Sequence, residues 1–402
     1  MQIFLFTDSF PYAFSEPFLE SELPFLAEKF DTVHIIPLFS NGNQREVAEN
    51  VNVWKPILDF NPRNRRKLLM NGIFNFSLCS FAVKEFFKKK IYKNRAWTWN
   101  FFSSLLLFRA IASNKKMLSE LNIKLRKEDK IYFYWGSRTA LIAPLLKKTN
   151  QSTVFVRFHR SDLYEEVNDG YIPFRESTFS AIDSFLPISE NGKTYLKSRY
   201  NIDEHKIYVS RLGVFDRVNN PVSTEKQPFH LVSCSNIIPV KRLYLIAEAL
   251  HLIDFQVVWT HIGAGKLFDE INKLAKNLPN NIQANFTGQL SNSQVIEFYT
   301  KNHVDLFINV STSEGVPVSI MEALSFGIPV VATDAGGTSE LVDDTVGYLL
   351  SVSVSAQEIA DVIRQLTKSD LNNLRKNAKK RWAERCNAQK NYSNFSEFIA
   401  QK

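Results

Sequence analysis

The chain has 402 residues, of which 45% are hydrophobic and 22% are charged. This length is too great for one ordinary hydrophobic core, so we expect about two domains. The net charge of +8 at pH 7 is local, because ten Lys or Arg and a single acidic residue, Glu85, lie between Arg63 and Arg95. No recognised nucleic-acid-binding motif accompanies these basic residues, which argues against a nucleic-acid-binding protein.

The N-terminus and the cysteines bear on localisation. The opening "MQIFLFTDSF" lacks a cationic start, which favours a first strand over a signal peptide. No apolar run approaches 18 residues, so we expect no membrane span. The three cysteines, Cys79, Cys234 and Cys386, lack CxxC spacing, which is typical of a reducing cytoplasm and predicts no zinc site.

Strand-like and helix-like patterns alternate through the first half of the chain. We expect strands near 2–6, 32–37, 131–135, 153–158, 185–188 and 207–211. We expect helices near 16–29, 64–90, 97–121, 137–148 and 189–199.

The second half repeats the alternation more regularly. We expect strands at 230–235, 255–262, 282–288, 304–310 and 328–332, each followed by a helix, and Ser291 with Gln294 forms a capping box for one of them. The polar segment 216–228 contains two prolines and predicts a linker between domains 1–215 and 229–384. Residues 385–402 predict a closing helix. Repeated βα units predict an α/β fold with two Rossmann-like, doubly wound domains that share a cleft, the last helix returning toward the first domain.

The segment 304–333 reads as strand, loop, helix and strand. Pro317 suits the first helical position, and Gly327 with Pro329 ends the helix. In a parallel sheet such a loop lies at the carboxyl edge where ligands bind, and a helix N-terminus suits phosphate. Glu314 on that rim and Glu322 in the helix are a layout for a sugar nucleotide. The alternative from these residues alone is a pair of solvated glutamates.

The run Glu314 to Val342, "EGVPVSIMEALSFGIPVVATDAGGTSELV", resembles the signature of retaining glycosyltransferases of family 4, whose two-domain fold is called GT-B. The pattern is a Glu, seven residues, a second Glu, then G-x-P, Gly-Gly and Glu-Leu-Val. The resemblance extends to residues 234–250, 261–267, 286–299 and 158–164. It covers the second half almost continuously and the first half in patches.

The resemblance implies roles for particular residues. Glu314 would hydrogen-bond the donor sugar, Glu322 would accept from the ribose hydroxyls, and Lys241 would pair with the donor diphosphate. His159 would lie near the reacting sugar; the alternative is a packed, hydrogen-bonded histidine. The rest of the expected donor site is Ser235, Asn236, Arg242, Gly263, Gln289, Leu290, Gly315, Val316, Pro317 and Val318.

Two departures from the family pattern stand out. Asn236 occupies the position five residues before the lysine where the family usually has an arginine, and Arg242 is the candidate substitute. The first loop, 7–23, lacks the Gly-Gly pair that many relatives have after the first strand. Ser15, Glu16 and Glu20 are candidates for facing the acceptor there, and the alternative is an ordinary helix start capped by Ser15.

The function implied is a retaining glycosyltransferase that moves a sugar from a nucleotide-diphosphate sugar to a saccharide or lipid-linked saccharide acceptor in surface polysaccharide synthesis. The chain has no Asp-x-Asp, so we expect neither a metal nor another cofactor. The alternatives are a nucleotide-sugar epimerase of the same fold and a non-catalytic sugar-nucleotide-binding subunit. A nicotinamide enzyme is disfavoured because Phe268 stands where the third glycine after Gly263 and Gly265 is needed.

The basic segment 63–95 also predicts a contact. Its cations are interleaved with aromatic residues, which suits an anionic bilayer surface and would place the protein on the inner face of the plasma membrane. The alternative is a solvated basic helix face. The aromatic residues are Phe74, Phe76, Phe81, Phe86, Phe87 and Tyr92.

Overall fold

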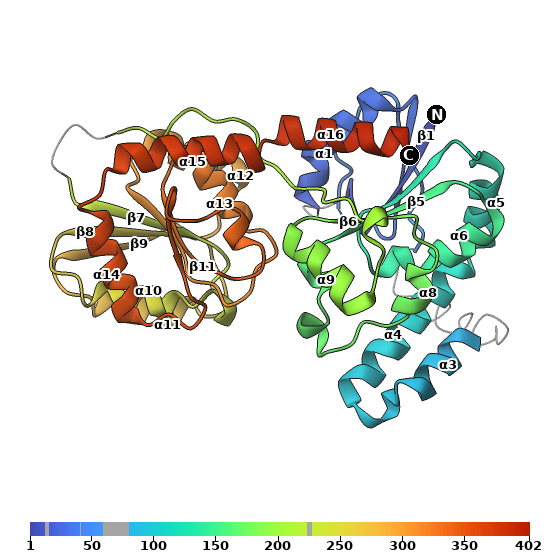
Figure 1. Ribbon diagram of the computed structural model, residues 1–402, viewed down its shortest axis with the longest axis horizontal. Coiled ribbons are helices and arrows are strands. Elements are labelled where there is room, and N and C mark those ends of the chain that lie inside the picture. Colours follow the sequence, from blue (N-terminus) through green and yellow to red (C-terminus); the bar gives the residue numbers. More distant parts are fainter. Residues whose placement is uncertain (13–15, 41, 59–79, 223–226) are drawn as a thin grey trace. The chain divides into compact units, whose positions relative to one another are not determined.

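The structure, a computed structural model, describes residues 1–12, 16–40, 42–58, 80–222 and 227–402 (Figure 1). The chain divides into two compact units. The first comprises Met1–Ser210 and Tyr392–Lys402, and the second comprises Arg211–Asn391.

The first unit is built on a six-stranded parallel sheet with the strand order β3-β2-β1-β4-β5-β6. Its strands are β1 (Gln2–Thr7), β2 (Thr32–Pro37), β3 (Val51–Val53), β4 (Lys130–Phe133), β5 (Thr153–Phe158) and β6 (Ser184–Pro187). Its α-helices are α1 (Pro17–Lys29), α3 (Ser80–Lys88), α4 (Arg95–Ala112), α5 (Lys115–Lys124), α6 (Ala143–Thr149), α7 (Arg160–Leu163), α8 (Arg175–Phe179), α9 (Glu190–Tyr200) and most of α16 (Ala388–Gln401).

Both faces of this sheet are buried, which is why its strands are continuous apolar runs. Along β1, Ile3 and Leu5 join a core with α1 and α16, whereas Phe4 and Phe6 join a second core on the opposite face. The residues of one strand point alternately to the two faces, so a strand covered on both sides needs no polar alternation.

Helices α7 and α8 were not expected, and most of the helix expected at 64–90 lies outside the described residues, which include α3. The first unit also differs from the sequence expectations in three other places. Residues 207–211 do not form a strand and contribute only an isolated bridge between Ile207 and Phe185. The short strand β3 was not expected. The helix expected at 97–121 is two helices, because Asn114 caps α5 through its side chain and ends the run from α4.

The second unit repeats the architecture with the order β12-β11-β10-β7-β8-β9, all parallel. Its strands are β7 (Phe229–Cys234), β8 (Val257–Ile262), β9 (Ile282–Phe286), β10 (Leu306–Asn309), β11 (Val330–Thr333) and β12 (Gly347–Leu350). Its α-helices are α10 (Leu243–Leu250), α11 (Phe268–Lys276), α12 (Asn292–Lys301), α13 (Val318–Ser325), α14 (Ala356–Leu366) and α15 (Leu371–Arg385). Figure 1 shows α10, α11 and α14 on one face of the sheet and α12, α13 and α15 on the other.

Counted in chain order within each unit, both sheets have the strand order 3-2-1-4-5-6. In such sheets ligands bind outside the carboxyl ends of the strands, at the point where the order reverses. That switch point lies between β7 and β10 in the second unit and between β1 and β4 in the first.

The segment expected as a linker, 216–228, begins inside the second unit. Asn220 is buried there, and its side-chain amide donates to the carbonyls of Tyr299 (2.7 Å) and Asn302 (2.8 Å). The boundary between the units therefore falls after Ser210. The closing helix is α16, which begins at Ala388, and residues from Tyr392 onward belong to the first unit.

Candidate functional site

A cavity of about 340 Å³ opens at the switch point of the second sheet. Ten of the residues expected at the donor site line it: Ser235, Asn236, Lys241, Gly263, Gln289, Leu290, Glu314, Val316, Pro317 and Val318. Cys234, Ile262, Val295 and Ser319 also line it and were not expected. They are the last residues of β7 and β8 and one residue each from α12 and α13, and three of them, Cys234, Ile262 and Val295, are apolar.

Lys241 and Glu314 meet across this cavity. Nζ of Lys241 donates to Oε1 of Glu314 at 2.5 Å, and Nδ2 of Asn309 donates to the same oxygen at 3.2 Å. Lys241 follows β7 and Glu314 follows β10, so the adjacency of these two strands brings together residues 73 positions apart. The pair gives the cavity a cation and a carboxylate that a ligand can separate.

Three glycines allow the surrounding loops to pack closely. Gly263 has φ +142°, and a Cβ there would lie 2.0 Å from the carbonyl oxygen of Ser235. Gly336 has φ +60°, and its Cβ would lie 2.0 Å from the carbonyl oxygen of Glu314. Gly337 N–H donates to the carbonyl of Gly315 at 2.7 Å. The Gly-Gly pair therefore supports the backbone that carries Glu314.

A buried hydrogen-bond chain lies beneath the cavity. Trp259 donates to the hydroxyl of Ser233 at 3.0 Å, Ser233 lies 2.9 Å from Nδ1 of His261, and Nε2 of His261 lies 3.1 Å from the carbonyl of Ser235. Since the Ser235 carbonyl can only accept, His261 carries its proton on Nε2. Burial lowers the pKa of His261 to about 4, so the ring is neutral at pH 7 and fixes the Ser235 backbone.

Glu322 lies on α13, and its Oε1 accepts from Nδ2 of Asn292 at 2.5 Å. Burial raises the pKa of this carboxyl to about 7, although the Asn292 hydrogen bond and Arg217 act in the opposite direction. Glu322 does not itself line the cavity, but a carboxyl whose pKa is raised by its surroundings is a candidate functional group.

Helix α13 begins at Val318, one residue later than expected, with Pro317 as its N-cap. Pro317, Val318 and Ser319 all line the cavity. The first N–H groups of a helix have no partner within the helix, so this end suits an anion.

Arg242 was expected as a phosphate contact, and the structure corrects this. Arg242 does not line the cavity, and its guanidinium donates to the carbonyls of Val310 (2.7 Å) and Val352 (2.7 Å). Arg242 therefore joins the end of β10 to the loop after β12. Gly315 also does not line the cavity, because its backbone faces Gly337.

In the first unit, Glu16 was expected to face an acceptor, and the structure corrects this as well. Its buried carboxylate accepts from the backbone N–H groups of Asp8 (2.9 Å), Ser9 (2.9 Å) and Phe10 (2.6 Å) and from Nε1 of Trp135 (2.7 Å). Successive N–H groups of this kind form an anion-binding nest. The loop after β1 lacks glycines and holds a carboxylate of its own chain in that nest.

The other two acceptor-side candidates differ in position. Ser15 lies outside the described residues. Glu20 is exposed and pairs with Arg45, whose Nη1 lies 3.1 Å from its Oε2.

Asp8 and Arg138 meet at the switch point of the first sheet, and neither was expected there. Nη1 of Arg138 donates to Oδ2 of Asp8 at 2.8 Å, whereas Oδ1 of Asp8 is buried without a hydrogen bond. Burial raises the pKa of Asp8 to about 6, against the opposing charge of Arg138.

His159 follows β5 and is buried. Its ring lies 4.4 Å from that of Trp135 and 4.9 Å from that of Tyr134, centroid to centroid, and its Nε2 has no hydrogen bond. Burial, aided by the nearby Arg157, lowers its pKa to about 3. The imidazole is therefore neutral at pH 7 and retains one unsatisfied ring nitrogen.

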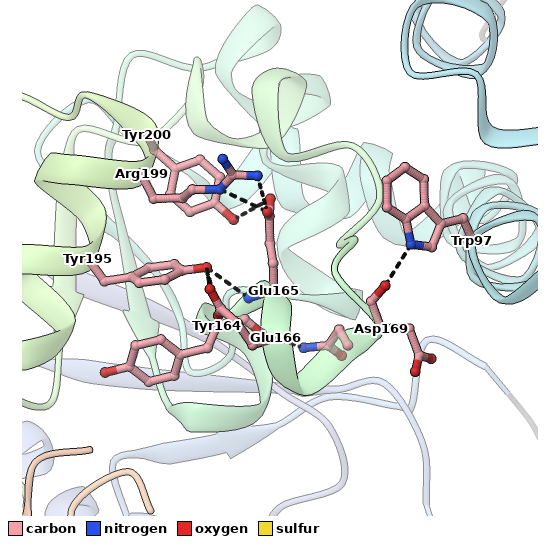
Figure 2. A network of polar contacts seen from close by, with 9 residues as sticks. Trp97, Tyr164, Glu165, Glu166, Asp169, Tyr195, Arg199 and Tyr200 are labelled. Atoms are coloured by element: carbon pink, nitrogen blue, oxygen red, sulfur yellow. Dashed lines mark hydrogen bonds and ion pairs between the residues drawn. The ribbon is translucent and has the colours of Figure 1, made fainter. Parts of the chain in front are cut away.

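The segment after His159 is held by polar contacts that sequence reasoning missed (Figure 2). The buried carboxylate of Glu165 accepts from Nε of Arg199 (2.9 Å) and from the hydroxyl of Tyr200 (3.0 Å). The hydroxyl of Tyr195 accepts from the backbone N–H of Glu165 at 3.0 Å. These contacts anchor the segment to α9 and so fix the backbone beyond His159.

No group of three or more His, Cys, Asp or Glu side chains in the described ranges is arranged to hold a metal ion. Among the helices in the described part of the chain, none combines the length and apolarity that crossing a bilayer requires.

Comparison with known families finds a similarity in the second unit. Residues 216–384 match the family described as glycosyl transferases group 1. This match lies within the second unit, Arg211–Asn391, and includes the residues that line the cavity.

Curated relatives agree with this family. The chain is 29% identical over 204 residues to the putative colanic acid biosynthesis glycosyltransferase WcaL of Escherichia coli, covering 48% of this chain and 50% of that protein. It is 24% identical over 283 residues to the amylovoran biosynthesis glycosyltransferase AmsK of Erwinia amylovora, covering 67% of this chain and 66% of that protein. The chain thus spans about half to two thirds of the length of these relatives.

Solved structures show the fold over the whole chain. The lipopolysaccharide outer core galactosyltransferase WaaB in its apo form superposes with a TM-score of 0.70 at 13% identity, covering 99% of both chains. Anabaena Alr3699/HepE in complex with UDP superposes with a TM-score of 0.67 at 16% identity, covering 100% of both chains. Two parallel-sheet, Rossmann-like units of this kind form the GT-B fold.

Proposed function

We propose that the chain is a glycosyltransferase that transfers a sugar from a nucleotide-diphosphate sugar to a saccharide or lipid-linked saccharide acceptor in surface polysaccharide synthesis. The observation that carries the proposal is the Lys241–Glu314 pair at the mouth of a cavity at the switch point of a group 1 domain. The names of WcaL and AmsK support the polysaccharide setting.

The donor diphosphate is proposed to bind at the start of α13, between the helix N–H groups and Lys241. A diphosphate competes with Glu314 for the ammonium group of Lys241, since both are anions within reach of the same cation. Its entry frees Glu314 to accept hydrogen bonds from the sugar. Glu322, one turn into the helix, is proposed to accept from the ribose hydroxyls, and its ionised form is the stronger acceptor.

Lys241 then has its main effect during bond cleavage. Negative charge accumulates on the departing diphosphate, and a fixed cation with helix N–H groups in a partly buried site stabilises that charge. These groups are proposed to serve without a metal ion. Activity that a chelator abolishes and Mn²⁺ restores would contradict this part of the proposal.

We propose transfer with retention, through displacement on one face. The acceptor oxygen forms its bond to the anomeric carbon on the face from which the diphosphate departs, and a departing phosphate oxygen takes the acceptor proton. In the alternative mechanism, that of retaining glycosidases, a carboxylate nucleophile about 5 Å from the general acid forms a covalent intermediate with the sugar. Glu314 also accepts from Asn309, a contact that does not involve Lys241, and this favours an orienting role. His159, neutral and buried, would shape the sugar pocket.

The experiment starts from donor identification. A panel of nucleotide sugars, beginning with UDP-sugars because HepE was solved with UDP, is screened for a rise in melting temperature. The stabilising donor is then incubated with candidate acceptors, and the first product from an α-linked donor is examined by proton NMR. An α-glycoside supports the proposal, and a β-glycoside contradicts retention. An epimerised nucleotide sugar would indicate the epimerase, and donor binding without turnover would indicate the non-catalytic subunit.

A further inference from the structure

Two helices of the first unit carry exposed aromatic side chains. Helices α3 and α4 are joined by a short 3₁₀ turn, Ile91–Lys93, and lie at the periphery of the unit (Figure 1). Phe87 on α3 is 65% exposed and Trp99 on α4 is 75% exposed. Val83, Tyr92 and Phe102 are also exposed. We call these five residues the aromatic face.

The aromatic face is continuous because Phe86 joins its parts. The ring centroid of Phe86 lies 5.5 Å from that of Phe87, 6.0 Å from that of Tyr92 and 5.9 Å from that of Phe102. Trp99 precedes Phe102 by three residues on α4 and therefore lies on the same side of the helix. Contiguous apolar surface of this kind marks an interaction site, whereas single exposed residues do not.

The sequence expectation for this region is partly corrected. Phe81 and Phe86 are half-buried and pack against the core, so they are not contact residues. Phe74 and Phe76 lie outside the described residues. Trp99 and Phe102, which the basic segment did not include, are exposed. The aromatic face therefore lies on α3, on α4 and on the turn between them, whereas the sequence expectation placed the contact along residues 63–95.

Cations surround the aromatic face. Lys84, Lys90, Lys93 and Arg95 are exposed, and Lys88 is exposed and pairs with Glu176 at 3.1 Å. Glu85 is the only acidic residue between 80 and 103, and it is buried, where its carboxylate accepts from the hydroxyl of Tyr171 at 2.5 Å and the N–H of Phe174 at 3.0 Å. The solvent-facing charge of α3 and the following turn is thus positive.

We propose that the aromatic face is a docking surface for an anionic lipid bilayer, with Trp99 and Phe87 entering the interfacial region and the surrounding cations lying at the headgroups. The positive charge around the aromatic face favours an anionic bilayer over a second copy of the protein. A second copy of the same face would bring like charges together, whereas anionic headgroups complement them. Trp and Tyr are also the side chains that favour the membrane–water interface.

Flotation of the purified protein with vesicles tests the proposal. Vesicles of phosphatidylcholine containing phosphatidylglycerol should recover the protein, and vesicles of phosphatidylcholine alone should recover little. The Phe87→Ser/Trp99→Ser variant should lose most of the recovery. The Lys84→Gln/Lys93→Gln variant should lower partitioning roughly 25-fold, since each cation near the surface contributes roughly fivefold.

A matched control keeps the test specific. Ile123→Ser/Lys127→Gln removes one exposed apolar residue and one exposed cation from another part of the same unit and should float like the wild type. Equal recovery of the wild type and the Phe87→Ser/Trp99→Ser variant would overturn the proposal. A wild-type dimer that this variant dissociates, with no flotation of either, would also overturn it in favour of self-association.

The fluorescence of Trp99 gives a second readout. The wild-type emission should shift to shorter wavelength on adding anionic vesicles, and the Trp99→Phe variant should still float but lose most of that shift. No shift in a floating wild type would contradict the placement of Trp99. Neither measurement needs donor or acceptor, so the result is independent of the proposed transfer reaction.

Discussion

Nζ of Lys241 lies 2.5 Å from Oε1 of Glu314, across the boundary between two strands that are adjacent in the sheet but far apart in the sequence. If this cation stabilises the departing diphosphate, Lys241→Ala should lower kcat by about 10²–10³-fold, the range measured when a fixed donor to a developing anion is removed. Lys266→Ala, an exposed lysine of the same unit that does not line the cavity, is the matched control and should leave kcat unchanged. Steady-state kinetics of both variants decide this, and equal kcat values would contradict the role.

The substitution Glu322→Gln should raise the stability of the protein and weaken its binding of the donor at pH 8. Its pKa is raised from 4.5 to about 7, so its contribution to stability is complete below pH 4.5 and is lost as the pH rises toward 7. The free energy of unfolding that is lost over this pH range through Glu322 is roughly 3 kcal/mol at most. Glu322→Gln should therefore unfold at a higher denaturant concentration than the wild type at pH 8 but not at pH 4.5. The same variant should bind donor more weakly at pH 8. Gain of stability at both pH values alike would argue against an ionising Glu322.

Alanine substitutions at two glycines, Gly288 and Gly336, distinguish the cost of backbone strain from the cost of a steric clash. Gly288 and Gly336 both have positive φ, +73° and +60°, so an alanine at either costs about 1 kcal/mol of strain. A Cβ at Gly288 meets nothing within 4 Å, whereas one at Gly336 meets the Glu314 carbonyl at 2.0 Å. Gly336→Ala should therefore lose more stability than Gly288→Ala and should also lower kcat by displacing Glu314. Chemical denaturation and kinetics of both variants test this, and equal stability losses would refute the packing role.

Sequence patterns predicted the alternating strands and helices, the capping box at Ser291 and most of the cavity, because periodicity, caps and loops at strand ends are local signals. They failed where the deciding contact is distant or conformational. The hydrogen-bond partners of Arg242 lie 68 and 110 positions away in the sequence, and the nest around Glu16 depends on the conformation of residues 8–10 in the same loop. The three-residue strand β3 is too short to show a period, and only its pairing with β2 reveals it.

His159 should remain neutral across the physiological range. Its pKa is lowered to about 3, so its contribution to stability is complete above pH 6.5 and is lost as the pH falls toward 3. In NMR spectra, the Cε1–H resonance assigned by its loss in His159→Gln should not titrate between pH 8 and pH 5. A midpoint near 6.5 for His159 would contradict its burial and reopen a role as a proton acceptor.

Removal of one partner of the buried Arg157–Glu22 pair should strongly destabilise the first unit. Both side chains are fully buried, Arg157 also donates to Ser210 at 2.7 Å, and its guanidinium lies 4.4 Å from the ring of Phe395 on α16. Glu22→Ala leaves a buried, unpaired cation and should cost about 3–5 kcal/mol of unfolding free energy.

An exposed ion pair provides the comparison. Asp361→Ala breaks the contact with Arg364 and should cost less than about 1 kcal/mol. Denaturant titrations of the two variants give the difference, and a small loss for Glu22→Ala would mean that the buried pair contributes little.

Calorimetric titration of the nucleotide sugar that most raises the melting temperature tests the proposed donor site most directly. Wild-type protein should bind one donor per chain, and Lys266→Ala should bind the donor like the wild type. Lys241→Ala and Glu322→Gln should each weaken donor binding at least about tenfold at pH 8, because this is the loss expected for a charge-assisted hydrogen bond. Equal affinity in all four proteins would show that the donor binds elsewhere and that the cavity between β7 and β10 is not its site.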